Sequence, residues 1–241
     1  MIFKVKRTNN SMDNLPKHIA IIPDGNRRWA KEKGLTAFEG HRQGFNQSIK
    51  IGEKSRKIGI KILTFWAFST ENWKRTKEEI FYLMNLYYQM IERNIKEALK
   101  DKIRIIHLGR KDRINNKLRL KIIEAEEKTK NFNKYYLVIA LDYGGKDEII
   151  RTVNKINQSR ININNLSEEK INQFLDTKDL PYPYPDLVIR TSGEMRTSGF
   201  MIWQTAYSEW IFHPKYFPDF NPNDLEKCIE EYKKRKRRFG V

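Results

Sequence analysis

Five short runs of apolar residues, rich in β-branched and aromatic side chains, recur along the chain. They cover residues 18–22, 62–68, 103–108, 136–141 and 187–189. Polar and apolar residues do not alternate within these runs, which is typical of strands buried on both faces. Segments of helical character separate them. The pattern therefore predicts an α/β fold in which a mostly parallel sheet is flanked by helices.

The clearest helical pattern begins at Thr76, whose side chain can cap the first turn together with Glu79 three residues later. The apolar residues that follow share one helix face: Ile80, Leu83, Met84, Tyr87, Ile91 and Ile95. Such a stripe usually packs on a core, and we favour that interpretation over a lipid-lining role. A second helix is expected at residues 224–238, which end in six consecutive basic residues. That end suits a solvated helix and a membrane or partner contact equally well.

The chain is expected to form one domain. No repeat of roughly 20 to 50 residues is present, and the only linker-like stretch is residues 176–185, where three prolines favour an extended approach to the next strand. We therefore predict a tail at residues 1–16 and one domain at residues 17–241.

Composition narrows the class of protein. Hydrophobic residues make up 39% of the 241 positions, which is enough for a sizeable core and too much for a disordered chain. Cys228 is the single cysteine, so an internal disulfide and a cysteine-based zinc site are excluded. No apolar run approaches the ~18 residues of a membrane span, and the first residues lack a signal-peptide pattern. A soluble, cytoplasmic protein is expected.

The charge balance favours an anionic partner. Lys and Arg number 47 against 30 Asp and Glu, which gives a formal net charge of +17. Nucleic acid, phosphorylated substrates and acidic lipid surfaces are all compatible with this excess. Motifs must decide between them, and the common nucleotide-binding loops G-x-x-x-x-G-K-[ST] and G-x-G-x-x-G are absent, as is the hydrolase motif G-x-S-x-G. The four histidines show no metal-ligand spacing.

A first candidate site follows the first predicted strand, at residues 23–31. Gly25 allows close backbone approach at the start of a helix, and Arg28 adds a charged fork, which together suit a phosphate. Asp24 fits such a site if Mg²⁺ lies between its carboxylate and the phosphate. The competing interpretation is that Asp24 only caps the helix.

Two further clusters also follow predicted strands. Residues 190–199 contain Arg-Thr-Ser-Gly twice, six residues apart, and their two arginines can surround a diphosphate. Residues 68–75 combine an amide, an indole and an arginine. Because α/β proteins bind ligands at the carboxyl ends of their strands, all three clusters are expected at one edge of the sheet.

Several blocks of the sequence resemble the signature regions of the cis-prenyltransferases, most closely bacterial-type undecaprenyl diphosphate synthase. They are residues 18–30, 40–44, 65–75, 186–194, 203–209 and 217–220, in the family's order and across essentially the whole chain. The resemblance implies a homodimeric, Mg²⁺-dependent transferase with a hydrophobic tunnel. Such an enzyme condenses isopentenyl diphosphate units in cis onto an allylic primer, expected to be farnesyl diphosphate. The expected product is undecaprenyl diphosphate, the carrier lipid for cell-wall glycan, released at the inner face of the membrane.

The resemblance also assigns roles to single residues. It implies that Asp24 is catalytic and binds Mg²⁺ and that Glu209 is the second Mg²⁺ ligand. The allylic diphosphate would be held by Gly25, Asn26, Arg27 and Arg28, with Trp29 and His41 beside them. Isopentenyl diphosphate would be held by Arg190, Arg196, Thr197 and Ser198. The loop that organises the condensation would present Ser69, Thr70, Glu71, Asn72, Trp73 and Arg75.

Asn72 matches a position that the family assigns to proton removal. An amide has no useful basicity near pH 7, so we expect Asn72 to orient a group while a diphosphate oxygen accepts the proton. Residues 238–240 resemble a C-terminal Arg-x-Gly that reaches the partner subunit's site.

The chain departs from the family at Ala37, where an arginine that contacts the allylic diphosphate is usual. Either the affinity for that substrate is weaker, or Arg42, Lys33 or Lys31 replaces the arginine. Two other functions stay open: a basic RNA-binding protein and a non-catalytic prenyltransferase-like subunit. Carboxylates inside the basic clusters argue against nucleic acid, and Ala37 is the only indication of a non-catalytic subunit.

Overall fold

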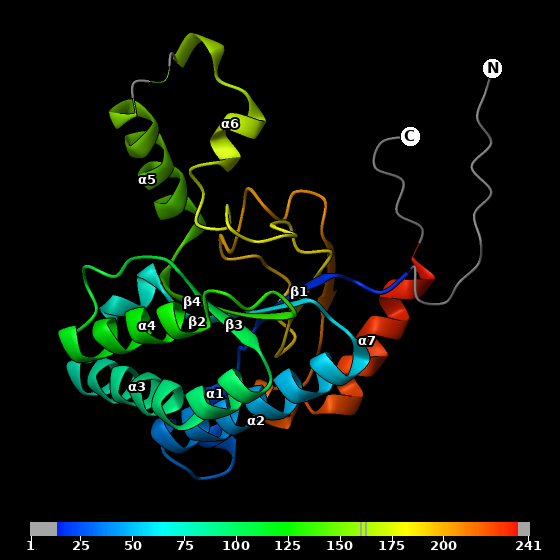
Figure 1. Cartoon of the computed structure of the whole chain (residues 1–241). Helices are drawn as coiled ribbons and strands as arrows, with labels where there is room; N and C mark the ends of the chain where they lie inside the picture. The colour runs from blue at the N-terminus through cyan, green and yellow to red at the C-terminus, as the bar shows by residue number, and fades with distance from the viewer. Residues whose placement is uncertain (1–13, 160, 162, 236–241) are drawn as a thin grey trace.

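The computed structural model describes residues 14–159, 161 and 163–235, and these contain a six-stranded sheet in which every pairing is parallel (Figure 1). The strands are β1 (His18–Ile22), β2 (Ile62–Ser69), β3 (Ile103–Leu108), β4 (Tyr135–Tyr143), β5 (Leu187–Arg190) and β6 (Glu209–Phe212). Their order is β3-β4-β2-β1-β5-β6. The predicted α/β class and parallel sheet are confirmed.

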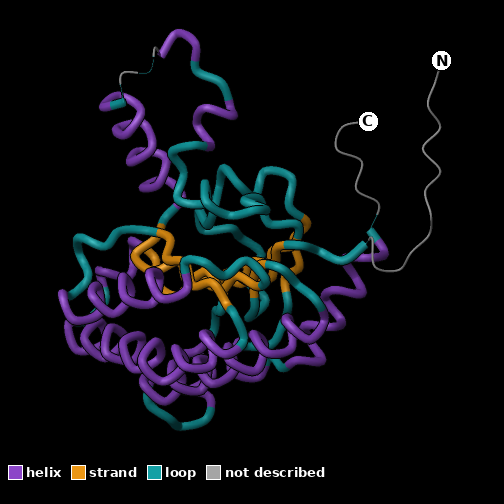
Figure 2. The backbone as a smooth tube through the Cα atoms, viewed as in Figure 1, coloured by secondary structure: helices purple, strands orange, loops and turns teal. Residues whose placement is uncertain are grey.

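Most of the helices lie on one side of this sheet. The helices are α1 (Asn26–Glu32), α2 (Ala37–Ile58), α3 (Lys77–Lys100), α4 (Asn116–Thr129), α5 (Gly145–Gln158), α6 (Glu168–Asn172) and α7 (Pro222–Lys234). Three short 3-10 segments are η1 (Thr70–Lys74), η2 (Ile163–Asn165) and η3 (Phe217–Asp219). In Figure 2 the helices α2, α3 and α7 lie below the sheet, loops cover its upper side, and α5 and α6 project away from the body.

Each face of the sheet contributes to a separate part of the core. On one face, Ile19, Ile21 and Ile189 pack with Ile51 of α2 and Leu225 of α7. On the other face, the buried strand residues pack against side chains from the loops: Ala20, Val138 and Val188 meet Leu180, Phe200 and Met201. Burial on both faces explains why the central strands read as continuous apolar runs.

The predicted elements agree with the structure except at the edge and at the end of the chain. Thr76 caps α3 by accepting a hydrogen bond from the backbone N–H of Glu79 at 3.3 Å, as expected. The edge strand β6 was not predicted, because it has only four residues and begins with Glu209. The C-terminal helix begins at Pro222, capped by Asn221, and ends at Lys234. Residues 1–13 of the predicted tail and residues 236–241, with the end of the basic run, lie outside the described residues.

The topology defines one crevice. β1 lies between β2 and β5. The chain continues from β1 to β2 on one side and from β5 to β6 on the other, so the connections that leave these two neighbouring strands lead in opposite directions across the sheet. Parallel α/β sheets bind ligands outside the carboxyl ends of the strands at such a position. No helix in the described part of the chain is long and apolar enough to cross a membrane.

Candidate active site

The site is organised around an ion pair between the ends of β1 and β5. Asp24 follows β1, and its Oδ2 accepts a hydrogen bond from Nη2 of Arg190, the last residue of β5, at 2.8 Å. Its Oδ1 accepts from the backbone N–H of Gly25 at 2.7 Å. Gly25 itself occupies the N-cap position of α1, without a side-chain cap. The helix-cap interpretation of Asp24 is therefore wrong.

Arg190 also holds the loop that follows β5. Its guanidinium is almost completely buried, and Nη1 donates to Ser198 Oγ at 2.8 Å and to the carbonyl oxygen of Arg196. Its Nε lies buried without a hydrogen-bond partner among the described residues. One buried side chain thus positions Asp24 and the Arg196–Ser198 segment relative to each other.

Glu194 joins the first and second clusters. Its carboxylate accepts from Arg28 Nη1 at 2.7 Å and from Arg196. Hydrogen bonding to Arg196, with the charges of Arg196 and Arg28, lowers the pKa of Glu194 below its usual range. Arg28 also donates to Ser192 Oγ at 2.7 Å and lies over the Tyr216 ring. The clusters at residues 23–31 and 190–199 therefore form one continuous basic site.

A close backbone approach fixes the start of α1. Gly25 has φ +98°, and a Cβ added there would lie 2.5 Å from Cδ1 of Tyr216. Both the conformation and the space therefore exclude other residues. On the α2 side, a Cβ at Gly44 would lie 2.2 Å from Oδ1 of Asn26, so α1 and α2 meet at small residues. Asn26 Oδ1 is buried and unpartnered among the described residues.

The third cluster forms the η1 segment directly after β2. Asn72 Oδ1 accepts a hydrogen bond from the backbone N–H of Ser69 at 3.1 Å, and the Ser69 side chain accepts from the backbone of η1 in return. The Asn72 carboxamide thus already holds its own loop. This use agrees with an orienting role for Asn72 and does not depend on any basicity of its amide.

Glu79 holds three cationic or titratable groups at the wall of the site. Its buried carboxylate contacts Arg75 at 3.0 Å, His41 Nε2 at 3.2 Å and Arg27 at 3.7 Å. Burial lowers the pKa of His41, with a smaller opposing effect from Glu79. A neutral imidazole therefore stands beside two guanidinium groups at neutral pH.

A cavity of about 410 Å³ opens from this polar site onto apolar side chains. Asp24, Arg190 and Asn72 lie in its polar lining, whereas Phe65 and Leu83 belong to its apolar lining. A second cavity of about 110 Å³ continues between α2, α3 and the sheet. The two share the lining residues Phe45, Ser48, Phe65, Met90 and Ile139. Together they form an apolar passage from the polar site toward the amino end of the sheet.

The stripe on α3 serves both this passage and the core. Leu83 and Tyr87 line the first cavity, and Ile91 and Ile95 line the second. Leu83 also packs with Met84 in the core cluster shared with α4. The favoured core-facing interpretation thus describes only part of the helix face.

The structure brings together most of the expected site residues. A further depression adjoins the first cavity at the carboxyl edge of the sheet, around the start of α1. The first cavity and this depression are lined by Asp24, Gly25, Asn26, Arg27, Arg28, His41, Ser69, Glu71, Asn72, Arg75, Arg190 and Ser198. The expected residues outside this lining are Trp29, Thr70, Trp73, Arg196, Thr197 and Glu209. Among these, Trp29 donates to Asp219 at 2.9 Å, and Trp73 donates to Asp142 at 2.8 Å.

Glu209 lies at the amino ends of the strands, whereas Asp24 lies beyond the carboxyl end of β1. It is the first residue of β6 and is level with Leu187 and Ile19, at the amino ends of β5 and β1. Asp24 is five residues beyond Ile19, which corresponds to roughly 16 Å along the strands. Glu209 accepts from Arg235 at 2.8 Å. Within one chain, Asp24 and Glu209 are therefore not brought together.

Sequence reasoning missed Glu79 and Tyr216 as parts of the site. Glu79 was considered only as part of a helix cap, and its spacing of four residues from Arg75 is the signal that could have indicated an ion pair. Tyr216 lies beyond β6, and no motif marks it. Its contact with Arg28 depends on the folded chain.

Comparison with known proteins identifies the family. The family model described as "Putative undecaprenyl diphosphate synthase" matches residues 22–240. The chain belongs to the undecaprenyl diphosphate synthase family. It is therefore an enzyme of the cis-prenyltransferase class, as the sequence resemblance indicated, and the match covers the whole described site.

Similar members of this family come from distant sources. An isoprenyl transferase of Thermotoga maritima is 47% identical over 228 residues, 94% of this chain and 97% of that protein. The ditrans,polycis-undecaprenyl-diphosphate synthase, (2E,6E)-farnesyl-diphosphate specific, of Micrococcus luteus is 41% identical, over 98% and 96% of the two chains. The crystal structure of lavandulyl diphosphate synthase from Lavandula x intermedia with dimethylallyl diphosphate superposes with a TM-score of 0.92. Its identity is 35%, over 95% of this chain and all of that one.

Glu79→Gln should lower the free energy of unfolding by about 2 kcal/mol, because Arg75, whose side chain is 25% exposed, loses the charged partner that the buried Glu79 provides. The neighbouring exposed residue provides a matched control, since Glu78→Gln should change stability by less than about 0.5 kcal/mol. Urea denaturation followed by circular dichroism measures both. Equal stabilities of the two variants would contradict a structural role for the Glu79 carboxylate.

Proposed function

We propose that this enzyme adds isopentenyl diphosphate units in cis to farnesyl diphosphate and produces undecaprenyl diphosphate. The supporting observation is a polar site rich in arginine that opens directly into an apolar passage. The polar site would hold the diphosphate group of the substrate, and the apolar passage would hold its prenyl chain. The family membership supports the reaction class, and the Micrococcus luteus relative is named for this product.

Charge and water exclusion explain how the site would promote condensation. Ionisation of an allylic diphosphate places negative charge on the leaving group and positive charge on carbon. Arg27 and Arg28 lie at the diphosphate end and stabilise the former. Phe65 and Leu83 line the cavity beyond and keep water from the carbocation. Asn72 would orient the second substrate, and a diphosphate oxygen would accept the proton.

The residues present fit Mg²⁺ that is shared with a diphosphate. No group of three or more His, Cys, Asp or Glu side chains suited to a metal occurs among the described residues. Mg²⁺ is commonly held by one or two carboxylates together with substrate phosphates, so Asp24 would be the protein ligand at this edge. When bound, Mg²⁺ would neutralise charge on the departing diphosphate.

The two diphosphates would occupy neighbouring parts of the basic site. Arg190 and Ser198 line the first cavity, with Arg196 next to them, and would hold isopentenyl diphosphate. Gly25, Asn26, Arg27 and Arg28 line the adjoining depression and would hold the allylic primer. Asp24 lines both. This arrangement places the reacting ends of the substrates beside η1.

A product assay tests the proposed function. The purified protein is incubated with farnesyl diphosphate, labelled isopentenyl diphosphate and Mg²⁺, and the extracted lipid is analysed for chain length. Undecaprenyl diphosphate is expected. Asp24→Ala should abolish turnover, because the side chain that faces both diphosphates is lost. A different chain length would overturn the product assignment, and an Asp24→Ala variant within tenfold of the parent would overturn the role of Asp24.

Ala37 lines the proposed primer site, and Lys31 is the candidate that would replace the usual arginine there. Lys31 lines the same depression as Ala37, whereas Lys33 and Arg42 do not. We expect Lys31→Ala to raise the KM for farnesyl diphosphate about tenfold, the loss of one charge-assisted contact. Ala37→Arg in that background should restore it. Lys33→Ala is the matched control, and an equal effect of both lysines would reject the assignment to Lys31.

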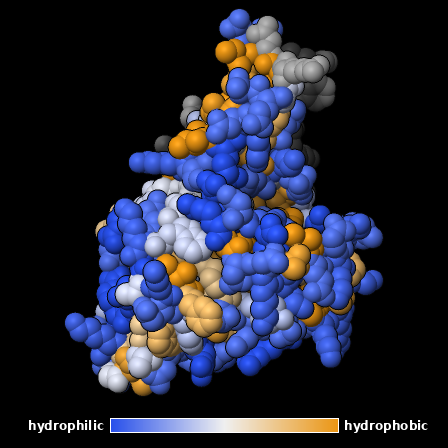
Figure 3. Space-filling model, turned by 90° about the vertical axis from the view of Figure 1, so that its left-hand side faces the viewer, coloured by the Kyte–Doolittle hydropathy of each residue, from blue (hydrophilic) through white to orange (hydrophobic). Residues whose placement is uncertain are grey.

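The proposal includes a homodimer. Glu209 cannot reach Asp24 of its own chain, so a second metal ligand from Glu209 requires another copy. The projecting α5 carries exposed apolar side chains, Ile150 at 62% and Val153 at 58%. Ile163 and Leu166 are exposed in the segment between α5 and α6 (Figure 1). Figure 3 shows hydrophobic side chains on the surface of this projecting part. An apolar surface of this kind is typical of a subunit contact.

The oligomeric state tests this surface. Light scattering after size-exclusion chromatography should give twice the chain mass of 28.9 kDa. Replacing Ile150 and Val153 together by lysine should produce a monomer, because it places two charges in the contact. The same replacement of Leu120 and Ile123, exposed on α4, should leave the dimer intact. A monomeric parent protein would refute the dimer.

The proposal places the enzyme in the cytoplasm, with its lipid product released at the inner face of the membrane, and gives it no nucleic-acid partner. Asp24 and Glu194 support the last point, because their carboxylates lie between the basic side chains and would repel a phosphate backbone.

A further inference from the structure

The turn after β4 contains a buried carboxylate that no proposed step uses. Asp142 is completely buried and has φ +52°. Its Oδ1 accepts a hydrogen bond from the indole N–H of Trp73 in η1 at 2.8 Å. Its Oδ2 accepts from Arg113 Nε at 2.8 Å, and Arg113 Nη2 also donates to Oδ1. A single side chain thus connects η1 to the loop between β3 and α4.

Trp73 is fixed on several sides by these contacts. Its ring packs edge to face on Phe68, with centroids 5.2 Å apart, and the guanidinium carbon of Arg113 lies 5.9 Å from the ring centroid. Trp73 does not line the cavities, although it directly follows Asn72, which does. The indole thus contacts no cavity itself, and it adjoins in sequence the residue that does.

The two glycines of the same turn contact both substrate loops. A Cβ at Gly144 would lie 2.5 Å from Oγ1 of Thr70, in η1. A Cβ at Gly145 would lie 2.5 Å from the carbonyl oxygen of Gly199, which accepts a hydrogen bond from the Gly145 N–H at 3.0 Å. Gly199 directly follows Ser198, so the turn separates η1 from the loop assigned to isopentenyl diphosphate.

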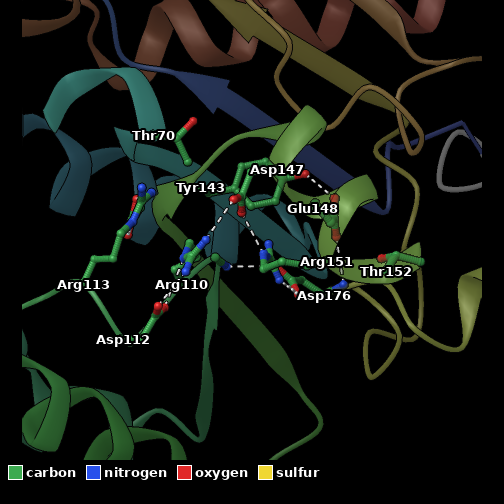
Figure 4. A network of polar contacts seen from close by, with 12 residues as sticks. Thr70, Arg110, Asp112, Arg113, Tyr143, Asp147, Glu148, Arg151, Thr152 and Asp176 are labelled. Carbon is green, nitrogen blue, oxygen red and sulfur yellow. Dashed lines mark hydrogen bonds and ion pairs between the residues drawn. The ribbon is translucent and has the colours of Figure 1, made fainter. Parts of the chain in front are cut away.

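A network of ion pairs lies beside the turn (Figure 4). Arg110 contacts Asp112 at 2.6 Å and Asp147 at 3.4 Å, and Arg151 contacts Asp147 at 2.7 Å and Asp176 at 2.6 Å. Asp147 belongs to the first turn of α5, two residues after Gly145. In Figure 4, Thr70 and Arg113 lie to the left of Tyr143, Arg110 and Asp112 lie below it, and Arg151 and Asp176 lie to its right.

We propose that the turn Asp142-Tyr143-Gly144-Gly145 sets the position of η1 relative to the Arg196–Ser198 loop, and that Asp142 is a positioning residue that acts through Trp73. The proposal rests on the proposed function, because it assumes that η1 and the Arg196–Ser198 loop hold the second substrate. The turn itself touches no substrate. Its effect is to keep Asn72 and the diphosphate-binding arginines in register.

Three variants separate positioning from general stability. Asp142→Ala leaves the indole N–H of Trp73 without its acceptor, and Trp73→Phe removes the donor. Asp142→Asn keeps Oδ1 as the acceptor for Trp73 and tolerates the positive φ, whereas it removes the charge that pairs with Arg113 and the acceptor for Arg113 Nε. We expect kcat to fall about tenfold in Asp142→Ala and in Trp73→Phe, and no further in the double variant. Asp142→Asn should retain kcat within about twofold.

Hydrogen exchange gives a readout that is independent of turnover. Amide exchange across residues 69–75 should accelerate in Asp142→Ala and stay at the parent rate in Asp142→Asn. The exposed Asp112, which pairs with Arg110 in the same network, is the control, and Asp112→Asn should change neither kcat nor exchange. Additive losses in the double variant, or equal exchange in Asp142→Ala and Asp142→Asn, would overturn the positioning role.

Replacement of Gly145 tests the second contact of the turn, which is the contact with the Gly199 backbone. Gly145→Ala pushes on the Gly199 backbone, so the KM for isopentenyl diphosphate should rise at least tenfold while the KM for the primer changes less than twofold. An unchanged KM for isopentenyl diphosphate, or an equal rise for both substrates, would overturn the proposed register. A parent protein without condensation activity would instead contradict the proposed function, and the exchange measurement would still decide the role of Asp142.

Discussion

A buried guanidinium must have a counter-charge and acceptors for its N–H groups, and the Arg190 side chain imposes this requirement on the whole carboxyl edge of the sheet. Asp24 supplies the charge, and Ser198 and the Arg196 carbonyl supply further acceptors. Because β1 and β5 are adjacent, one ion pair fixes the starts of two loops that are more than 160 residues apart in sequence. The remaining parts of the site are arranged around this pair.

The same edge shows how a basic protein keeps many arginines close together. Each arginine at the site has a carboxylate partner, and three carboxylates are shared. Asp24 lies between Arg190 and Arg28, Glu194 between Arg28 and Arg196, and Glu79 between Arg75 and Arg27. Shared partners reduce the mutual repulsion of the cations and also hold them in fixed directions. An incoming diphosphate would then meet donors that are already oriented, which lowers the cost of ordering them on binding.

Sequence patterns predicted the parts of the site that follow from the positions of the strands. They did not predict the parts that depend on an unrecognised strand or on the direction in which a side chain points. Apolar runs located five of the six strands, and the rule that ligands bind at strand ends placed Asp24, Arg190 and Asn72 at one edge. Glu209 could not be placed in the same way, because it begins an unrecognised edge strand and so lies at the other end of the sheet. Trp73 looked like a ligand because it adjoins Asn72, but its indole turns toward the buried Asp142, a partner 69 residues away.

The passage between α2 and α3 has one more consequence. Protein interiors are normally close-packed, with few voids between a sheet and the helices that cover it. Because the passage lies in this position, the protein without ligand lacks packing contacts on that face of the sheet. Under the proposed function, a prenyl chain bound there would supply these missing contacts. Burial of each five-carbon unit contributes on the order of 3–4 kcal/mol, and a ligand that binds only the folded state stabilises it. The protein should therefore become more resistant to unfolding as its product lengthens, and it loses that resistance when the lipid departs.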